Sequence, residues 1–113
     1  MTEGPIRIPL TFVRNRDETR TLEFYTDDAA TTPLDLTGRT YVASFAATPG
    51  ATVVFAVTGT VTAASGRVVF AATDTQTALL TGTTYWWDVV ETVGTTTTQI
   101  VLGPVTTQTG VTT

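Results

Sequence analysis

Cysteine, histidine and lysine are all absent from this chain. Without cysteine, no disulfide, thiolate nucleophile or cysteine metal site can form. The lack of histidine removes the commonest general base and the commonest metal ligand. The two serines, Ser44 and Ser65, therefore have no ordinary activating partner for nucleophilic catalysis. We expect a protein that is not an enzyme, with no catalytic residues.

Charged side chains are also scarce, at 14% of residues, and the net charge is −4. An acidic chain is a poor partner for phosphate backbones, so we expect no binding to nucleic acid. The N-terminus lacks the basic and apolar regions of a secretory signal. No apolar run approaches the roughly 20 residues of a spanning helix, so we expect synthesis in the cytoplasm and no membrane contact.

The remaining polar chemistry lies in carboxylates. A glycosidase needs two carboxyls facing each other across a cleft, and a domain of this size has little room for one. Asp27 and Asp28, with Asp35, could offer oxygen ligands to calcium, but their spacing matches no recognised calcium loop. We therefore expect solvated carboxylates, no metal and no cofactor.

Three arginines near the N-terminus, at positions 14, 16 and 20, are interrupted by Asp17 and Glu18. A basic stretch that bound a polyanion would lack such interruptions. We expect these side chains to pair with one another locally.

Threonine and valine are abundant, and both are β-branched residues that suit strands better than helices. Short apolar runs alternate with Gly, Pro and Asp punctuation, which predicts one all-β domain over 1–113, with loose termini at 1–4 and 108–113. We expect an immunoglobulin-like β-sandwich of about seven strands with one short helical turn. The expected strands are 6–13, 19–26, 39–47, 52–58 with a continuation through Gly59, 67–71, 83–93, and 96–106 broken at Gly103-Pro104. The expected helical turn is 73–80, with Thr73 or Asp74 as its cap and Ala78, Leu79 and Leu80 packing it down.

Two residue patterns add detail to these strands. Proline cannot donate to a strand ladder, so Pro9 puts the first strand at a sheet edge or at a bulge. Tyr41, Ala43 and Phe45 alternate with other residues, so we expect them on one face of the strand at 39–47.

The start of the strand at 83–93 resembles a tyrosine corner. Leu79 precedes Tyr85 by six residues, with Gly82 between them. In such a corner the tyrosine hydroxyl bonds back to the backbone of the link between the two sheets. The alternative is an ordinary aromatic residue at the opening of a strand.

Trp86 and Trp87 follow Tyr85 directly. Successive strand residues point to opposite faces, so both indoles cannot enter one core. If Tyr85, Trp87 and Val89 face inward, Trp86, Asp88 and Val90 form an outward-facing candidate interface, because Trp is enriched at binding hot spots. Alternatively, a loop or the C-terminal tail of the same chain covers Trp86; stacking on carbohydrate is a third reading.

Three short segments carry a resemblance to a known family. Residues 33–38 read P-L-D-L-T-G before an expected strand; residues 66–70 read G-R-V-V-F, and after Asp74 residues 80–89 read L-T-G-T-T-Y-W-W-D-V. Over about 17–105 this is similar to the β-sandwich domains of siphophage baseplate and tail proteins, such as the N-terminal domain of baseplate upper proteins.

The resemblance implies a non-enzymatic building block of the virion, in the tail or baseplate, that docks to other virion proteins in a homo-oligomer or symmetric assembly. Baseplate upper proteins continue beyond this domain, whereas this chain ends at Thr113, so we expect a free-standing version. The alternatives are a capsid decoration protein and a carbohydrate- or cell-surface-binding module.

Overall fold

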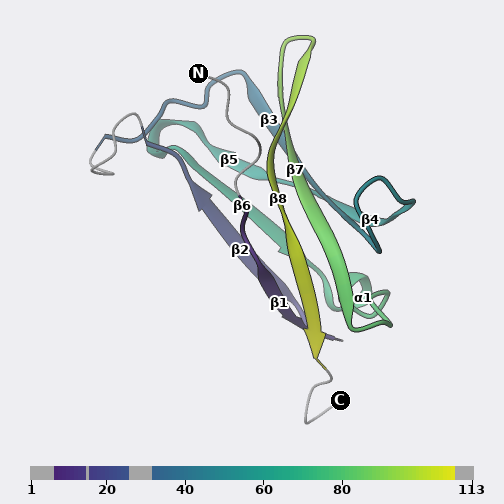
Figure 1. Ribbon diagram of the computed structural model, residues 1–113. Helices are drawn as coiled ribbons and strands as arrows, with labels where there is room; N and C mark the ends of the chain where they lie inside the picture. The colour runs from purple at the N-terminus through teal and green to yellow at the C-terminus, as the bar shows by residue number, and fades with distance from the viewer. Residues whose placement is uncertain (1–6, 15, 26–31, 109–113) are drawn as a thin grey trace.

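The computed structural model describes residues 7–14, 16–25 and 32–108. Within these residues the protein is mostly β, with eight strands in two sheets, one short helix and one 3-10 turn (Figure 1). The coarse expectation is confirmed, with one strand more than the seven expected. The elements are β1 Leu10–Val13, β2 Glu18–Glu23, β3 Arg39–Ala46, β4 Val53–Thr58, β5 Thr60–Thr62, η1 Ala63–Ser65, β6 Arg67–Ala72, α1 Asp74–Thr77, β7 Thr84–Val93 and β8 Thr96–Gln108.

The strands form a five-stranded sheet in the order β1-β8-β7-β3-β4 and a three-stranded sheet in the order β2-β6-β5. Neighbouring strands are antiparallel except β1, which runs parallel to β8. The chain passes from one sheet to the other between β1 and β2, β2 and β3, β4 and β5, and β6 and β7. Both sheets are therefore assembled from segments distant in sequence.

The facing sides of the two sheets share one hydrophobic core. On β3 the residues expected to share one face, Tyr41, Ala43 and Phe45, are all buried and alternate with more exposed neighbours. Trp87 lies in the core with 1% of its surface exposed. Its ring stacks on Phe45 at 5.9 Å and meets Phe70 of the opposite sheet edge-on at 6.4 Å. The Trp87 indole therefore packs against side chains of both sheets.

Gly59 marks the point where the chain leaves the five-stranded sheet. The expected continuation of one strand through Gly59 is wrong, because β4 ends there and β5 pairs with β6 in the other sheet. The Gly59 amide still donates to the Tyr41 carbonyl at 2.8 Å. A Cβ at Gly59 would lie 2.4 Å from Cγ1 of Val68 and 2.9 Å from Cε1 of Phe70. A residue without a side chain is therefore needed for the chain to cross so close to β6.

The helical turn is present but shorter than expected. α1 begins after Thr73, whose hydroxyl accepts the Gln76 amide at 3.2 Å while the Gln76 side chain accepts the Thr73 amide at 2.9 Å. This is a capping box, and it confirms Thr73 as the cap. Beyond α1, Leu80 is buried, but Leu79 is 50% exposed, so the expectation that Leu79 packs the turn down is wrong.

β8 runs without a break through Gly103 and Pro104, contrary to expectation. β1 pairs with β8 only from Val105 onward, so at Pro104 the strand has a partner on one side alone and tolerates the missing amide. At Gly103 the backbone of Ile8 fills the space, since a Cβ there would lie 2.2 Å from the Ile8 carbonyl oxygen. The glycine permits a close approach of two backbones rather than ending the strand.

The terminal boundaries also differ from expectation. The expected first strand at 6–13 begins only at Leu10, after Pro9, and lies at a sheet edge as the proline predicted. Gln108, expected in a loose tail, is the last residue of β8. Residues 1–4, Ile6 and 109–113 lie outside the described residues.

Candidate interaction surface

The side chains of the predicted interface share the outer face of the five-stranded sheet. Tyr85, Trp87 and Val89 are buried on the inner face of β7, so Trp86, Asp88 and Val90 occupy the outer one. Strand register sets their neighbours: Trp86 lies opposite Ala46 and Pro104, Asp88 opposite Ser44 and Leu102, and Val90 opposite Val42 and Gln99. The structure therefore brings the three predicted residues together on one face.

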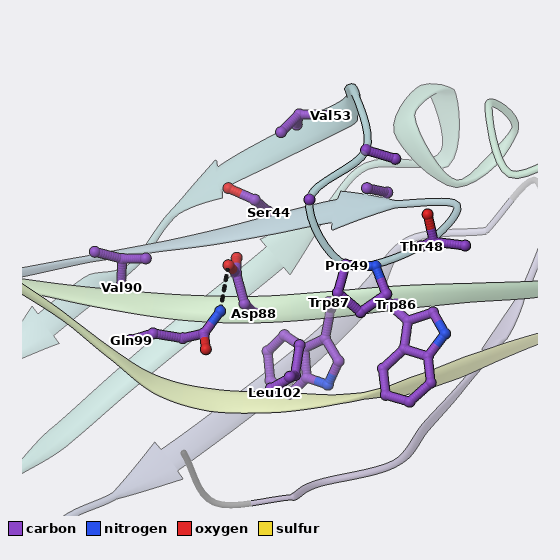
Figure 2. A pocket seen from close by; sticks show the side chains of 13 residues that line it. Ser44, Thr48, Pro49, Val53, Trp86, Trp87, Asp88, Val90, Gln99 and Leu102 are labelled. Atoms are coloured by element: carbon purple, nitrogen blue, oxygen red, sulfur yellow. Dashed lines mark hydrogen bonds between the residues drawn. The ribbon is translucent and has the colours of Figure 1, made fainter. Parts of the chain in front are cut away.

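A groove of about 210 Å³ runs over this face (Figure 2). Its walls come from β3, β7 and β8, and from the loop at 48–51 that leads into β4. The lining is largely apolar and includes Ala46, Pro49, Val53, Val90 and Leu102 beside Trp86. Val53 at the groove margin is 49% exposed. The sequence could place Trp86 on this face, but it could not show that the 48–51 loop would wall a groove beside it.

Trp86 itself is half-buried. The guanidinium carbon of Arg7 lies 5.9 Å from the indole centroid, within the range of a cation–π contact. The 48–51 loop lines the groove together with Trp86. Its own chain therefore covers one portion of the indole and leaves the rest accessible.

Asp88 places a carboxylate in this apolar setting. Its Oδ2 accepts a hydrogen bond from the Gln99 side chain at 3.0 Å. Its Oδ1 is buried, and no partner for it occurs among the described residues. In Figure 2 Ser44, on the neighbouring strand, points into the same groove. The groove therefore combines an aromatic face, aliphatic walls and one carboxylate oxygen with unused accepting capacity.

The Tyr85 hydroxyl bonds back to the chain that links the sheets. It accepts a hydrogen bond from the Gly82 amide at 2.7 Å. The Gly82 carbonyl in turn accepts from the Thr107 hydroxyl of β8. Leu79 is half-exposed, and the hydroxyl meets Gly82 rather than Leu79. This contact fixes the entry of the chain into β7 and thereby the orientation of Trp86.

Arg14 supports the same link, a role that sequence reasoning missed. Its Nε donates to the Leu80 carbonyl at 2.8 Å, and its Nη2 donates to the carbonyls of Thr81 and Gly82 at 3.2 and 3.1 Å. The expected local pairing holds for Arg20 and Glu18, which are 3.1 Å apart, but is wrong for Arg14. Nothing in the local sequence reveals a contact across more than 60 residues.

No metal centre appears in the described part of the chain, where no group of three or more acidic side chains comes together. Asp27 and Asp28 lie outside the described residues. The Asp35 carboxylate accepts the hydroxyl and the amide of Thr37 at 2.6 and 3.0 Å. These hydrogen bonds lower the pKa of Asp35 below its ordinary value. Over the same residues, no helix has the length and apolarity needed to cross a membrane.

No protein-family model matches the sequence, and no curated protein matches it. The groove around Trp86 therefore has to be interpreted from its own geometry.

Proposed function

We propose that this chain is a non-enzymatic structural domain of a tailed-phage particle, in the tail or baseplate, that docks to other virion proteins. The docking surface is the outer face of the five-stranded sheet. The observation that carries the proposal is the groove of about 210 Å³ in which a half-buried Trp86 lies among aliphatic side chains. Partly exposed Trp in an apolar depression is typical of protein interface hot spots.

We infer further that the two sheets form an immunoglobulin-like β-sandwich. The strand distribution supports this inference, because β2-β6-β5 faces a sheet in which β3 and β4 extend the β8-β7 pair. The hydrogen bond from the Gly82 amide to the Tyr85 hydroxyl adds support, since it occurs where the chain enters a new sheet.

The residues that carry the phage resemblance have structural roles in this fold. In the P-L-D-L-T-G segment Asp35 caps a turn through Thr37, Leu36 is fully buried, and Gly38 has φ of +80°. A positive φ at this point favours glycine. The resemblance therefore supports a shared fold, and the docking role rests on the groove.

The groove does not favour the carbohydrate-binding alternative. Sugar-binding faces usually present several aligned aromatic rings, whereas Trp86 is the one aromatic side chain on the described outer face of β3, β4, β7 and β8. A glycan array would separate the two functions, since only a carbohydrate module should give signal.

Immunogold electron microscopy with an antibody against this chain tests where the chain lies on particles of the phage that encodes it. Label at the tail tip or baseplate supports the proposal. Label over the head would instead indicate a capsid decoration protein. Particles without label would refute both virion functions.

Trp86→Ala tests the docking surface. We expect the variant to fold, because the indole lies outside the core, and to weaken incorporation into particles by about 30-fold, the effect of losing one hot spot of about 2 kcal/mol. Leu79→Ala is the control, because Leu79 is a large exposed apolar residue that lies away from the groove. If Trp86→Ala unfolds the domain, or if both variants assemble alike, the groove is not the docking site.

A further inference from the structure

The free edges of the two sheets differ in how well they are protected. A strand at a sheet edge carries unpaired backbone groups, and proteins usually block them with charges, proline, bulges or short length. Among the strands that the structure describes, four lie at an edge: β1 and β4 in the five-stranded sheet, and β2 and β5 in the three-stranded sheet. Their protection can be compared strand by strand.

Three of these edges carry such protection. β1 has four residues and follows Pro9, and Arg20 donates from its side chain to the Thr11 carbonyl at 2.6 Å. β2 contains Glu18, Arg20 and Glu23. β5 has three residues and leads directly into a 3-10 turn. None of the three offers a long uncharged edge.

β4 is different. Its six residues, V-V-F-A-V-T, include no charge and no proline. No charged residue occurs anywhere between Arg39 and Arg67, so the loop before β4 and the crossing after it are uncharged as well. Only a bulge opposite Phe45 and Ala46 disturbs the strand, and it lies at the beginning of β4.

The hydrogen bonds show which backbone groups of β4 remain available. The Gly59 amide donates to Tyr41 of β3, so by strand alternation the amides of Phe55 and Val57 also point toward β3. The amides of Ala56 and Thr58 therefore point to the open side. In the part of the chain that the structure describes, no backbone bond reaches that side. Ala56 and Thr58 are also exposed.

We propose that β4 pairs antiparallel with β4 of a second copy, about a two-fold axis close to Ala56, which joins two five-stranded sheets into one. The absence of charge along β4 suits a second copy of this chain as the partner of this edge. In a two-fold contact the residue on the axis meets its own counterpart, so a charge at or next to the axis would lie close to a like charge of the second copy. An uncharged edge on a chain of net charge −4 removes that repulsion where the copies would meet.

The pairing would also extend the candidate docking surface. Val53 of β4 lines the Trp86 groove, so two paired copies would present their grooves on one continuous sheet. The inference goes beyond the proposed function, because docking to other virion proteins does not require two copies to pair, and it names the strand that would join them. Sedimentation of the purified chain tests the pairing, whereas particle labelling tests the location, so failure of one does not imply failure of the other.

Charge substitutions at Ala56 give the decisive experiment. We expect the wild-type chain to sediment as a dimer in a concentration series up to about 1 mM, a range that detects weak association. Ala56→Lys and Ala56→Glu should each sediment as monomers, because like charges then meet across the axis. An equimolar mixture of the two variants should recover the dimer, which a misfolded variant could not do. Ala71→Lys, at an exposed alanine of the central strand β6, should leave the dimer intact.

Three results would overturn the pairing. A wild-type chain that stays monomeric throughout the series would exclude it. Ala56→Lys that dimerises like the wild type would place the contact elsewhere. Loss of the dimer in both Ala56→Lys and Ala71→Lys would show a general charge effect rather than an edge contact.

Discussion

Replacement of Gly103 by alanine tests how the segment just before β1 packs against β8. The added Cβ would lie 2.2 Å from the Ile8 carbonyl oxygen and 2.7 Å from its carbon, and both are backbone atoms. The same oxygen accepts the indole Nε1–H of Trp87 at 2.8 Å. To restore a normal contact, the Ile8 backbone must retreat by about 1 Å, which would break the bond to Trp87.

Two costs add in this variant. Crowding of a packed interior costs about 1–3 kcal/mol. A buried indole N–H without a partner costs about 1–3 kcal/mol more. We therefore expect Gly103→Ala to lower the free energy of unfolding by about 2–6 kcal/mol, which corresponds to a fall of about 8–24 °C in Tm at about 4 °C per kcal/mol.

Urea and thermal unfolding followed by tryptophan fluorescence measure the loss, and a double-mutant cycle separates its two parts. In a Trp87→Phe background the indole N–H is already absent, so Gly103→Ala should cost less there, by about the hydrogen-bond share. A Gly103→Ala variant within about 0.5 kcal/mol of the wild type would refute the crowding argument. An equal cost in both backgrounds would show that the Ile8 carbonyl does not act through Trp87.

Two further substitutions probe contacts that the structure defines closely. The Tyr41 hydroxyl donates to Glu91 at 2.6 Å, and burial together with the neighbouring carboxylate raises the pKa of Tyr41 above 10.0. Because the unfolded phenol ionises first, stability should hold below about pH 10 and fall as the pH rises further. Tyr41→Phe should cost about 1.5–3 kcal/mol at neutral pH and flatten that alkaline decline, as measured by urea unfolding at several pH values. Thr73→Ala should lower the free energy of unfolding by about 1 kcal/mol, as measured by thermal unfolding, because the capping box is lost. Thr75→Ala, at an exposed position of the same helix, should lower it by less. Equal losses in the two variants would show that the cap does not stabilise α1.

The alternation of apolar residues allowed β3 and β7 to be predicted with their faces correct, because a period of two survives in any sheet that buries one side. The same rule put Trp86 and Asp88 on the outer face. It could not reveal the crossing at Gly59, which depends on how closely Val68 and Phe70 approach from another strand. Nor could it show that Gly103 continues a strand, because the reason is the distant backbone of Ile8.

The groove is likewise formed by contacts between segments that are distant in sequence. Its existence requires the 48–51 loop to lie beside β7, and the turn that leads into β7 is held by the bonds from Arg14 to the carbonyls of Leu80, Thr81 and Gly82. These contacts join segments far apart in sequence. Local patterns predict which face a side chain occupies, but they do not predict what the fold places next to it.

The Trp86-Trp87 pair shows how the core fixes the exposed surface. A shift of one residue in the register of β7 would exchange the two faces, sending Trp86 inward and Trp87 outward. That exchange would remove Trp87 from Phe45 and Phe70 and would separate its Nε1 from the Ile8 carbonyl. Burial of the Trp87 indole therefore opposes a register shift of β7. Trp86 stays on the outer face because Trp87, the next residue, packs on the inner face. Substitutions at Trp87 should consequently alter the groove even though Trp87 lies mainly in the core.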